Sequence, residues 1–528
     1  MTLTGHSIID GADVVGTDGT VTAVDPATGA PLEPAFTALD PDQVRAATDA
    51  AAGAFPAYRS TTPGERAGFL EAIAEEIEGI GDELLRRAQA ESGLAQARLT
   101  GERGRTCGQL RLFADVVRRG DHLGVRIDPA LPERTPAPRP DLRMRQVALG
   151  PVAVFGASNF PLAFSTAGGD TAAALAAGCP VVVKAHPAHP GTAELVARAV
   201  VRAAARTGMP AGVFSLVHGR GTAVGTALVT DPRIAAVGFT GSRAGGLALV
   251  AAAAGRPRPI PVYAEMSATN PVVVLDGALG DDPTALAEGY VGSLTLGSGQ
   301  FCTNPGLLFV PSGERGDAFV AAVAEAFGQT TGQTMLTPEI GDAFTGGVQR
   351  RLADGRLRLV AESRAGEGAN APAGAVFEAG LADLAGDPEL QEEVFGASGL
   401  VVRYRDLDAL LPVLAGLEGQ LTATVHAIDG DEADARRLLP TLELIAGRVL
   451  FNGWPTGVEV SPAMVHGGPF PATSDGRSTS VGTLAIERFQ RPVCYQDVPA
   501  ELLPEPLRDD NPWSVSRQLD GVLTLPGS

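Results

Sequence analysis

Cysteine is scarce in this sequence, with four residues in 528, at positions 107, 179, 302 and 494. None of them forms a CxxC pair, so neither a disulfide framework nor a cysteine-based zinc site is indicated. The first residues also lack the basic segment and apolar run that a secretory signal requires. We therefore expect a protein of the reducing cytoplasm, in which a cysteine is either packed in the core or reactive.

Positive charge and long apolar runs are also in short supply. The formal net charge is -20, and such an acidic chain has no excess of cations to displace counterions from a nucleic acid. No stretch of about 18 residues is apolar throughout, so no membrane span is expected. The length of 528 residues, with 45% hydrophobic residues, is enough for two or three domains with separate cores.

Short apolar runs separated by helix-like segments dominate the middle of the chain. The first five runs lie at residues 152–155, 180–184, 212–217, 235–240 and 261–265. Four more runs lie at residues 271–275, 306–310, 398–404 and 422–428. Strands that alternate with helices form βαβ units, so the pattern predicts an α/β protein with two regions of parallel sheet.

The flanking segments carry less regular patterns. Ala-rich stretches at 44–55 and 67–92 have helical spacing and are expected to form surface helices. The Pro- and Arg-rich passage 126–151 is interpreted as an extended connector or arm. The Pro-rich, polar part from residue 492 onward is expected to be an irregular tail.

One cysteine stands in an unusual setting. Cys302 lies in LGSGQFCTNPG, where glycines and a proline favour tight turns and close approach of the backbone. Cys179, by contrast, lies in the apolar run AAGCPVVV, which is typical of a packed cysteine. Cys302 is therefore the candidate nucleophile, although a single cysteine in a turn is not by itself evidence of catalysis.

Polar residues follow three of the predicted strands, at the sheet edge where ligands of parallel sheets bind. Asn159 comes after the first run and is either a simple turn former or the donor to an oxyanion. Glu265 ends another run and is either a solvated acid or a general base. Gly241 and Ser242 begin a glycine-rich turn that offers N–H groups to a phosphate, although it does not match GxGxxG.

Six motifs, taken in order, resemble the aldehyde dehydrogenase superfamily over roughly residues 20 to 495. The motifs are SNFPL with Asn159, VVVK with Lys184, VGFTGSRAGG from Val237 to Gly246, EMS with Glu265, GQFC with Cys302 and EEVFG with Glu393. The resemblance implies an α/β aldehyde dehydrogenase fold with two Rossmann-like parallel-sheet domains and an oligomerisation arm. It places the dinucleotide-binding domain at 1–125 and 151–269, the catalytic domain at 270–465, and the arm and C-terminal tail at 126–150 and 466–528.

The resemblance also implies a role for each matching residue. Cys302 would be the nucleophile, Glu265 the base that activates the deacylating water, and Asn159 the oxyanion donor. The implied cofactor contacts are Lys184, His186, Gly241, Ser242, Gly246, Glu393 and Phe395. The implied reaction is NAD(P)-dependent oxidation of an aldehyde to a carboxylic acid through a thiohemiacetal and a thioester on the cysteine. No metal is expected, because the histidines show no ligand spacing.

Three segments resemble a narrower branch of the superfamily. GQFCTNPG, HGGPFPATS and QRPVCYQDVP match 2-oxoglutarate semialdehyde dehydrogenases and an NADP-dependent fatty aldehyde dehydrogenase. His466, in the second segment, would lie near the thiol, and the alternative is a packed or surface histidine. The resemblance favours 2,5-dioxopentanoate as the substrate, with medium- and long-chain aliphatic aldehydes as the alternative.

By the same resemblance, the segment after FNG lines the substrate tunnel with Phe451, Trp454 and Phe470. These apolar side chains suit a slender aliphatic chain, whereas an acid needs a cation or several N–H donors at the far end of the tunnel. Arg477 and the Gly467-Gly468 backbone are the candidates for that role.

The cofactor is expected to be NADP, with NAD possible. NAD-preferring relatives often carry a glutamate three residues after the ribose lysine, and here that position is Pro187. No carboxylate would therefore repel a 2′-phosphate. A homo-oligomer, dimer or tetramer, is expected from the resemblance alone. Two other functions stay open: an acylating reductase, against which Glu265 argues, and a catalytically silent binding protein, against which the presence of all three catalytic candidates argues.

Overall fold

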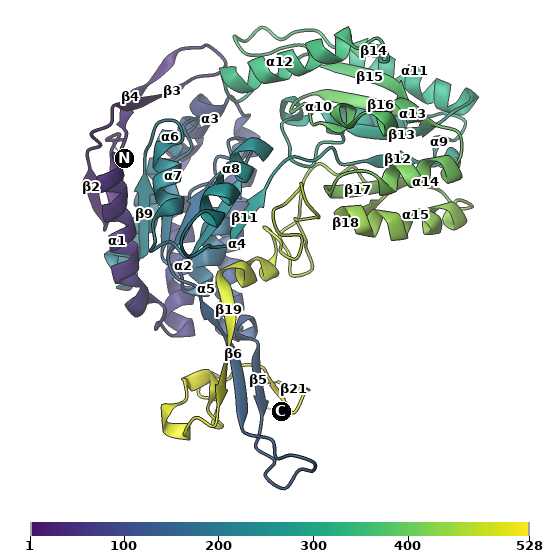
Figure 1. Ribbon diagram of the computed structural model, residues 1–528. Helices are drawn as coiled ribbons and strands as arrows, with labels where there is room; N and C mark the ends of the chain where they lie inside the picture. The colour runs from purple at the N-terminus through teal and green to yellow at the C-terminus, as the bar shows by residue number, and fades with distance from the viewer. Residues whose placement is uncertain (1–2, 526–528) are drawn as a thin grey trace.

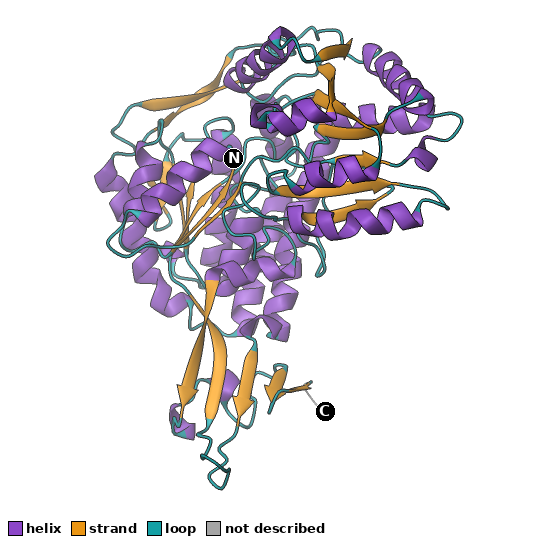
Figure 2. Cartoon of the chain, turned by 45° about the vertical axis from the view of Figure 1, so that its right-hand side comes forward, coloured by secondary structure: helices purple, strands orange, loops and turns teal. Residues whose placement is uncertain are grey.

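Two seven-stranded sheets and a projecting arm form the body of the protein in a computed structural model that describes residues 3–525 (Figure 1). The colouring of Figure 2 shows helices packed against both large sheets and an arm built around strands, with loops and short helical turns at its edges. None of the described helices combines the length and apolar character needed to cross a bilayer. The α/β class with two regions of parallel sheet is confirmed.

The first sheet contains all five strands predicted for it. Its order is β11 (Val262–Glu265), β10 (Ala236–Thr240), β7 (Val152–Phe155), β8 (Val181–Lys184), β9 (Phe214–Val217), β1 (Ser7–Ile9) and β2 (Ala12–Val14). The five strands from β11 to β9 are parallel, and the hairpin β1–β2 adds an antiparallel edge that the sequence did not predict. Chain order reverses at β7, so a crevice opens beyond its carboxyl end.

Helices cover both faces of the first sheet because its strands are apolar on both sides. Val152, Val154 and Val181 pack on one face against the first helix group, and Ala153 and Val182 pack on the other face against the second. The first group is α2 (Pro63–Ile80), α3 (Asp82–Ser92), α4 (Gln96–Arg119), α5 (Gly169–Ala177) and α6 (Pro190–Thr207). The second group is α1 (Pro41–Tyr58), α7 (Ala223–Thr230) and α8 (Arg243–Ala254).

The Ala-rich stretch 67–92 forms two helices, and not one. Thr62 begins α2 by accepting a hydrogen bond from the Glu65 amide, while the Glu65 carboxylate accepts from Thr62 in return. Gly81, with φ of 68°, ends α2 and precedes α3. A left-handed φ breaks the α-helical path, and glycine adopts it at little cost.

The second sheet contains the remaining four predicted strands and three that were missed. Its order is β14 (Arg358–Glu362), β15 (Ala375–Gly380), β16 (Ser398–Tyr404), β13 (Leu307–Pro311), β12 (Val272–Val274), β17 (Gln420–His426) and β18 (Ala446–Phe451). All are parallel except β14. The surrounding helices are α9 (Asp276–Leu279), α10 (Thr284–Thr295), α11 (Glu314–Gly328), α12 (Pro338–Ala353), α13 (Leu381–Gly386), α14 (Leu407–Ala415) and α15 (Glu432–Ile445).

The arm is a five-stranded sheet, which corrects the expectation of an irregular C-terminal tail. Its order is β19 (Gln490–Gln496), β6 (Leu142–Ala148), β5 (Val125–Asp128), β20 (Arg517–Leu519) and β21 (Val522–Thr524). The arm predicted at 126–151 thus exists, and segments from the end of the chain complete its sheet on both sides (Figure 1). The tail was misread because strands at a sheet edge need few buried side chains.

Short elements complete the chain. A separate ribbon is formed by β3 (Thr20–Val24) and β4 (Pro31–Thr37). The 3-10 helices are η1 (Asp121–Leu123), η2 (Ala211–Val213), η3 (Leu296–Gly299), η4 (Pro388–Gln391), η5 (Thr483–Phe489), η6 (Ala500–Leu502) and η7 (Glu505–Leu507).

Candidate active site

The predicted catalytic residues come from distant parts of the chain and meet between the two large sheets. Asn159 follows β7, and Glu265 ends β11, both at the carboxyl edge of the first sheet. Cys302 lies between η3 and β13 of the second sheet, and His466 lies in the segment that leads from β18 to the arm. The side chains of Asn159, Glu265 and His466 are buried, and Cys302 is partly exposed.

A single histidine nitrogen connects the thiol to the carboxylate. The Sγ of Cys302 lies 3.4 Å from the Nε2 of His466, and that nitrogen lies 2.9 Å from the Oε1 of Glu265. Nε2 donates to the carboxylate when it carries a proton and accepts from the thiol when it does not, so this pair is placed to take a proton that leaves the thiol. The sequence-derived hypothesis that His466 lies near the thiol agrees with this placement.

Hydrogen bonds keep Glu265 ionised in spite of its burial. Burial opposes its charge, but His466 and a hydrogen bond donated by Ser480 at 2.6 Å hold the pKa of the Glu265 carboxyl below its ordinary value. A carboxylate that is ionised at neutral pH is able to accept a proton from water. Ser480 was missed by the sequence, because a lone serine in STSV carries no motif.

The thiol of Cys302 is not ionised in this state. Burial and, secondly, the nearby Glu265 carboxylate raise the pKa of the Cys302 thiol well above its ordinary value. A resting thiol is protected from oxidation, since the thiolate is the reactive form. Nucleophilic attack therefore requires removal of the proton as the aldehyde arrives, and the His466–Glu265 pair is placed for that step.

The loop before Cys302 adopts a left-handed path. Gly297, Ser298 and Gly299 have φ of 56°, 60° and 69°. A Cβ on Gly299 would lie 2.3 Å from the backbone carbon of Gly396, so this glycine also permits close contact with the segment that carries Glu393. The glycines around the thiol therefore have the structural role that their spacing indicated.

Amide side chains hold the backbone around the thiol. The Nδ2 of Asn159 donates to the carbonyl of Gln300 at 3.0 Å, and the Nδ2 of Asn270 donates to the carbonyl of Cys302 at 2.9 Å. An amide nitrogen carries two hydrogens, so Asn159 keeps one donor for an oxygen bound beside the thiol. This arrangement suits an oxyanion donor.

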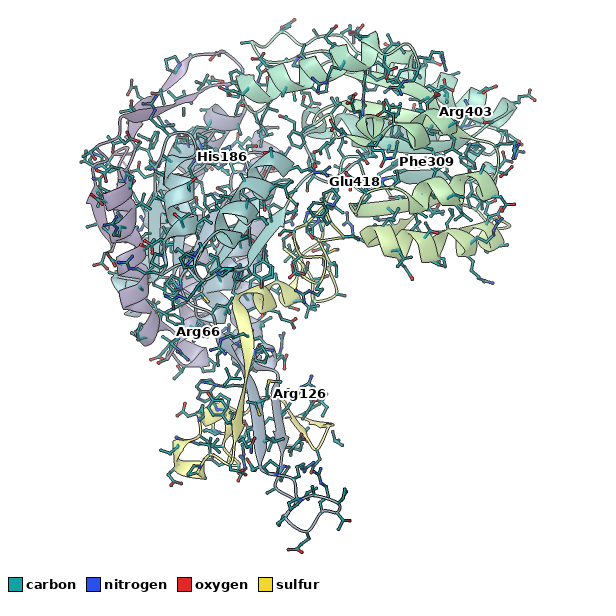
Figure 3. The ribbon with its side chains drawn as sticks, viewed as in Figure 1. Arg66, Arg126, His186, Phe309, Arg403 and Glu418 are labelled. Carbon is teal, nitrogen blue, oxygen red and sulfur yellow. The ribbon has the colours of Figure 1, made fainter. Side chains whose placement is uncertain are left out.

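A cavity of about 770 Å³ runs from the thiol along the carboxyl edge of the first sheet. The predicted cofactor contacts His186, Gly241, Ser242, Glu393 and Phe395 line it. His186 lies in the unit built on the first sheet, whereas Phe309 marks the second sheet across from it (Figure 3). This volume is that of a ligand site of ordinary size, and Cys302, Asn159 and Glu265 are among the residues that line it.

Two half-buried ionisable side chains, Lys184 and Glu393, have no ion-pair partner and fit the ribose of a dinucleotide. Burial lowers the pKa of Lys184 to about 8 and raises the pKa of Glu393 to about 8. Neither side chain makes an ion pair with the rest of residues 3–525. Hydroxyl groups that accept from the lysine and donate to the carboxylate would satisfy both.

The glycine-rich turn has a mixed role. Gly241 and Ser242 line the cavity, and the Oγ of Ser242 accepts from the Gly245 amide at 3.2 Å, which caps the start of α8. The amino end of α8 thus faces the cavity, as phosphate binding requires. At Gly246, a Cβ would lie 2.7 Å from the Sδ of Met266, so this glycine allows α8 to pack on β11.

The three residues predicted for the substrate tunnel lie in different surroundings, and their role there stays a prediction. Trp454 packs against Tyr290 and His426, with ring centroids 5.7 Å and 4.5 Å away. Phe451 and Phe470 are 60% and 58% exposed. The cluster that includes Phe301, the residue before Cys302, contains Phe160 and Phe164, and Val458 and Met464 from the segment after FNG pack against it.

Glu265, Cys302 and His466 together also have the composition of a metal site. One ligand atom from each of Glu265, Cys302 and His466 lies within 4.8 Å of the others. A zinc ion prefers such ligands. A metal ion bound there would block the sulfur, nitrogen and oxygen atoms that the thiol chemistry uses. The absence of a resident metal stays a prediction.

The comparisons with known proteins agree with the site. The model of the aldehyde dehydrogenase family matches residues 14–479. Alpha-ketoglutaric semialdehyde dehydrogenase 2 of Azospirillum brasilense is 56% identical over 525 residues, which cover 99% of each chain. Alpha-ketoglutaric semialdehyde dehydrogenase of Acinetobacter baylyi is 49% identical over 521 residues, which cover 98% of this chain and 99% of the relative.

Solved structures share the fold. The crystal structure of an NADP dependent enzyme of E. coli superimposes with a TM-score of 0.79 and 25% identity, and covers 93% of this chain and 98% of its own. The family match, the full-length relatives and the shared fold all agree with the thiol, carboxylate and cofactor cavity described above, and the chain belongs to the aldehyde dehydrogenase family.

Proposed function

We propose that this enzyme oxidises 2-oxoglutarate semialdehyde, which is 2,5-dioxopentanoate, to 2-oxoglutarate with NADP as the hydride acceptor. The observation that carries the reaction is the contact of the Cys302 thiol with His466, and of His466 with Glu265. The names of the two relatives at 56% and 49% identity support the substrate.

The residues divide the reaction into two halves. In the first, the thiol proton passes to the His466–Glu265 pair and Sγ bonds to the aldehyde carbon, while Asn159 donates to the oxygen. A bound nicotinamide ring supplies the acceptor for the hydride that then leaves this carbon. In the second half, after the thiol proton has passed to solvent, Glu265 takes a proton from water and the water oxygen bonds to the thioester carbon. The carbon–sulfur bond then breaks to release the acid, and the sulfur takes back a proton from the pair.

The substrate is tested by comparing aldehydes on the purified full-length enzyme. We expect kcat/KM for 2,5-dioxopentanoate to exceed that for hexanal and for a long-chain aldehyde by at least about tenfold, or 1.4 kcal/mol of transition-state stabilisation. Aliphatic aldehydes are the second candidate, because Phe160, Phe164 and Phe301 form an apolar cluster, and the Phe164 ring lies 6.1 Å from the ring of His466. A tenfold advantage for the aliphatic aldehydes would make that candidate correct.

The cofactor preference follows from the side chains near the ribose position. His186 and Pro187 line the cavity there. Pro187 stands where NAD-preferring relatives often have a glutamate, so no carboxylate at this position repels a 2′-phosphate. Burial lowers the pKa of His186 well below its ordinary value, so its ring is neutral until an anion binds. A 2′-phosphate would supply that anion and would also lie near Lys184.

We therefore expect kcat/KM with NADP to equal or exceed that with NAD, measured at saturating aldehyde. Pro187→Glu would place a carboxylate near the phosphate and is expected to move the preference toward NAD by about tenfold or more. A wild-type preference for NAD of that size would contradict the proposal.

We also propose a role for each of the two sheet regions and for the arm. The regions 1–125 and 151–269, built on the first sheet, bind the dinucleotide, and the region 270–465 carries the nucleophile. The arm would join copies of the chain into a homo-oligomer, which is supported by its edge strand β21, where Val522 and Leu523 are 67% and 62% exposed. An edge strand with exposed apolar side chains is a surface that another chain is able to cover.

A further inference from the structure

Arg105 is a half-buried arginine with two buried nitrogen atoms that have no hydrogen-bond partner. Its side chain extends from α4 and lies over the ring of Phe164, with Cζ 4.9 Å from the ring centroid. The Nε and Nη2 atoms are shielded from solvent and make no hydrogen bond with any part of residues 3–525. A buried guanidinium is costly unless it is paired, so these two donors call for an anion.

Arg98 and Arg488 differ from Arg105 because each makes an ion pair, although each also keeps one buried nitrogen without a partner. Arg98, two turns earlier on α4, pairs with Glu102 at 3.2 Å and donates to the carbonyl of Asn159 at 2.6 Å. Arg488 pairs with Asp170 at 2.8 Å. Burial lowers the pKa of Arg105, and the negative forms of Cys302 and Glu265 are among the charges that oppose this shift.

The contacts of Phe164 place Arg105 on the substrate side of the thiol. The Phe164 ring lies 6.1 Å from the ring of His466, which reaches the thiol at 3.4 Å. Phe164 also belongs to the apolar cluster with Phe160 and Phe301, which the cofactor cavity does not include. A short chain that starts at the thiol and crosses this cluster would end at the guanidinium.

We propose that Arg105 binds the carboxylate of the substrate and selects semialdehyde acids over neutral aldehydes. This inference rests on the proposed function. The free Nε and Nη2 atoms form one edge of the guanidinium, and a carboxylate accepts two parallel hydrogen bonds from such an edge. The aldehyde carbon then lies at the thiol, the carboxylate at Arg105, and the methylene groups between them pack on the phenylalanine rings.

Arg477, a candidate from the sequence, does not fill this role. Its side chain is 91% exposed and pairs with Asp475 at 3.0 Å. Arg448 is a nearer rival, because its Nε is also buried and unpartnered within the described chain. However, the Nη2 of Arg448 already donates to the carbonyls of Pro455 and Gly457. Only its Nε is left for a carboxylate on that edge of the guanidinium, whereas Arg105 has both Nε and Nη2.

The test compares an acid with a neutral aldehyde of the same length in Arg105→Met, Arg105→Lys and the parent enzyme. The substrates are 2,5-dioxopentanoate and pentanal, with kcat and KM measured separately at saturating NADP. We expect Arg105→Met to lower kcat/KM for the acid by about 100-fold, mainly through KM, and to change that for pentanal by less than about threefold. Arg105→Lys should lose less, since it keeps the charge but not the paired donors.

Arg477→Met is the matched control and should leave both substrates unchanged, because that side chain is exposed. The inference is overturned if Arg105→Met lowers activity on both substrates equally, or if only Arg448→Met loses the preference for the acid. If Arg105→Met does not fold, Arg105→Lys must show the weakened binding of the acid alone. A parent enzyme that favours pentanal would instead refute the proposed function, whatever the variants do.

Discussion

Cys302→Ala is expected to reduce aldehyde oxidation to below about a thousandth of the parental rate, because no other group replaces the attacking sulfur. The variant should still bind the dinucleotide within about threefold of the parental Kd, since the cavity is lined mainly by other residues. Both quantities are measurable on the same sample, the first by the absorbance of reduced cofactor and the second by calorimetry.

Cys494→Ala is the control for this experiment. Cys494 is exposed on β19 in the arm, so its loss should leave the rate unchanged. Turnover by Cys302→Ala above a tenth of the parental rate would show that the covalent route is wrong.

Glu265→Gln is expected to slow the release of the acid by about 10²- to 10⁴-fold and to trap the acyl enzyme. Intact-protein mass spectrometry after addition of aldehyde and cofactor should then show a mass increase on the protein. Loss of both the adduct and the pre-steady-state burst would mean that the earlier step, transfer of the thiol proton to the His466–Glu265 pair, depends on Glu265 more than deacylation does.

The pH dependence gives an independent check on Glu265. The base must be ionised, and its pKa is held below the ordinary value, so deacylation should persist at lower pH than an isolated carboxylate would allow. Ser480→Ala removes one of the hydrogen bonds that lower this pKa. The acid limb of the deacylation rate should therefore move to higher pH in this variant, and no adduct should accumulate at neutral pH.

The central strands could be predicted from the sequence because they are apolar on both faces. Every residue of β7 and β9 is buried, so their runs are unbroken and easily recognised. The strands that were missed lie toward sheet edges and carry mixed side chains. For example, β14 reads RLVAE with no fully buried residue, and β19 contains Pro492.

Catalytic candidates could be predicted from the sequence where they directly follow a predicted strand. Asn159 and Glu265 follow strands of one sheet, and the carboxyl ends of parallel strands meet at one edge. Ser480 and Arg105 lie outside this rule. Ser480 contacts Glu265 across 215 positions of sequence, and Arg105 lies on a helix whose inward face could not be assigned from the sequence alone.

The catalytic cluster is assembled across the seam between the two large sheets. Glu265 lies at the end of a strand of the first sheet, and the thiol lies in a loop of the second. His466 lies in the segment between β18 and the arm strand β19. Heating that only loosens this seam would stop turnover while both sheets kept their helices and strands. We therefore expect the temperature at which activity is lost to depend on the stability of the contact between the two sheet units. Substitutions that raise the thermal stability of the active enzyme are best sought at that contact.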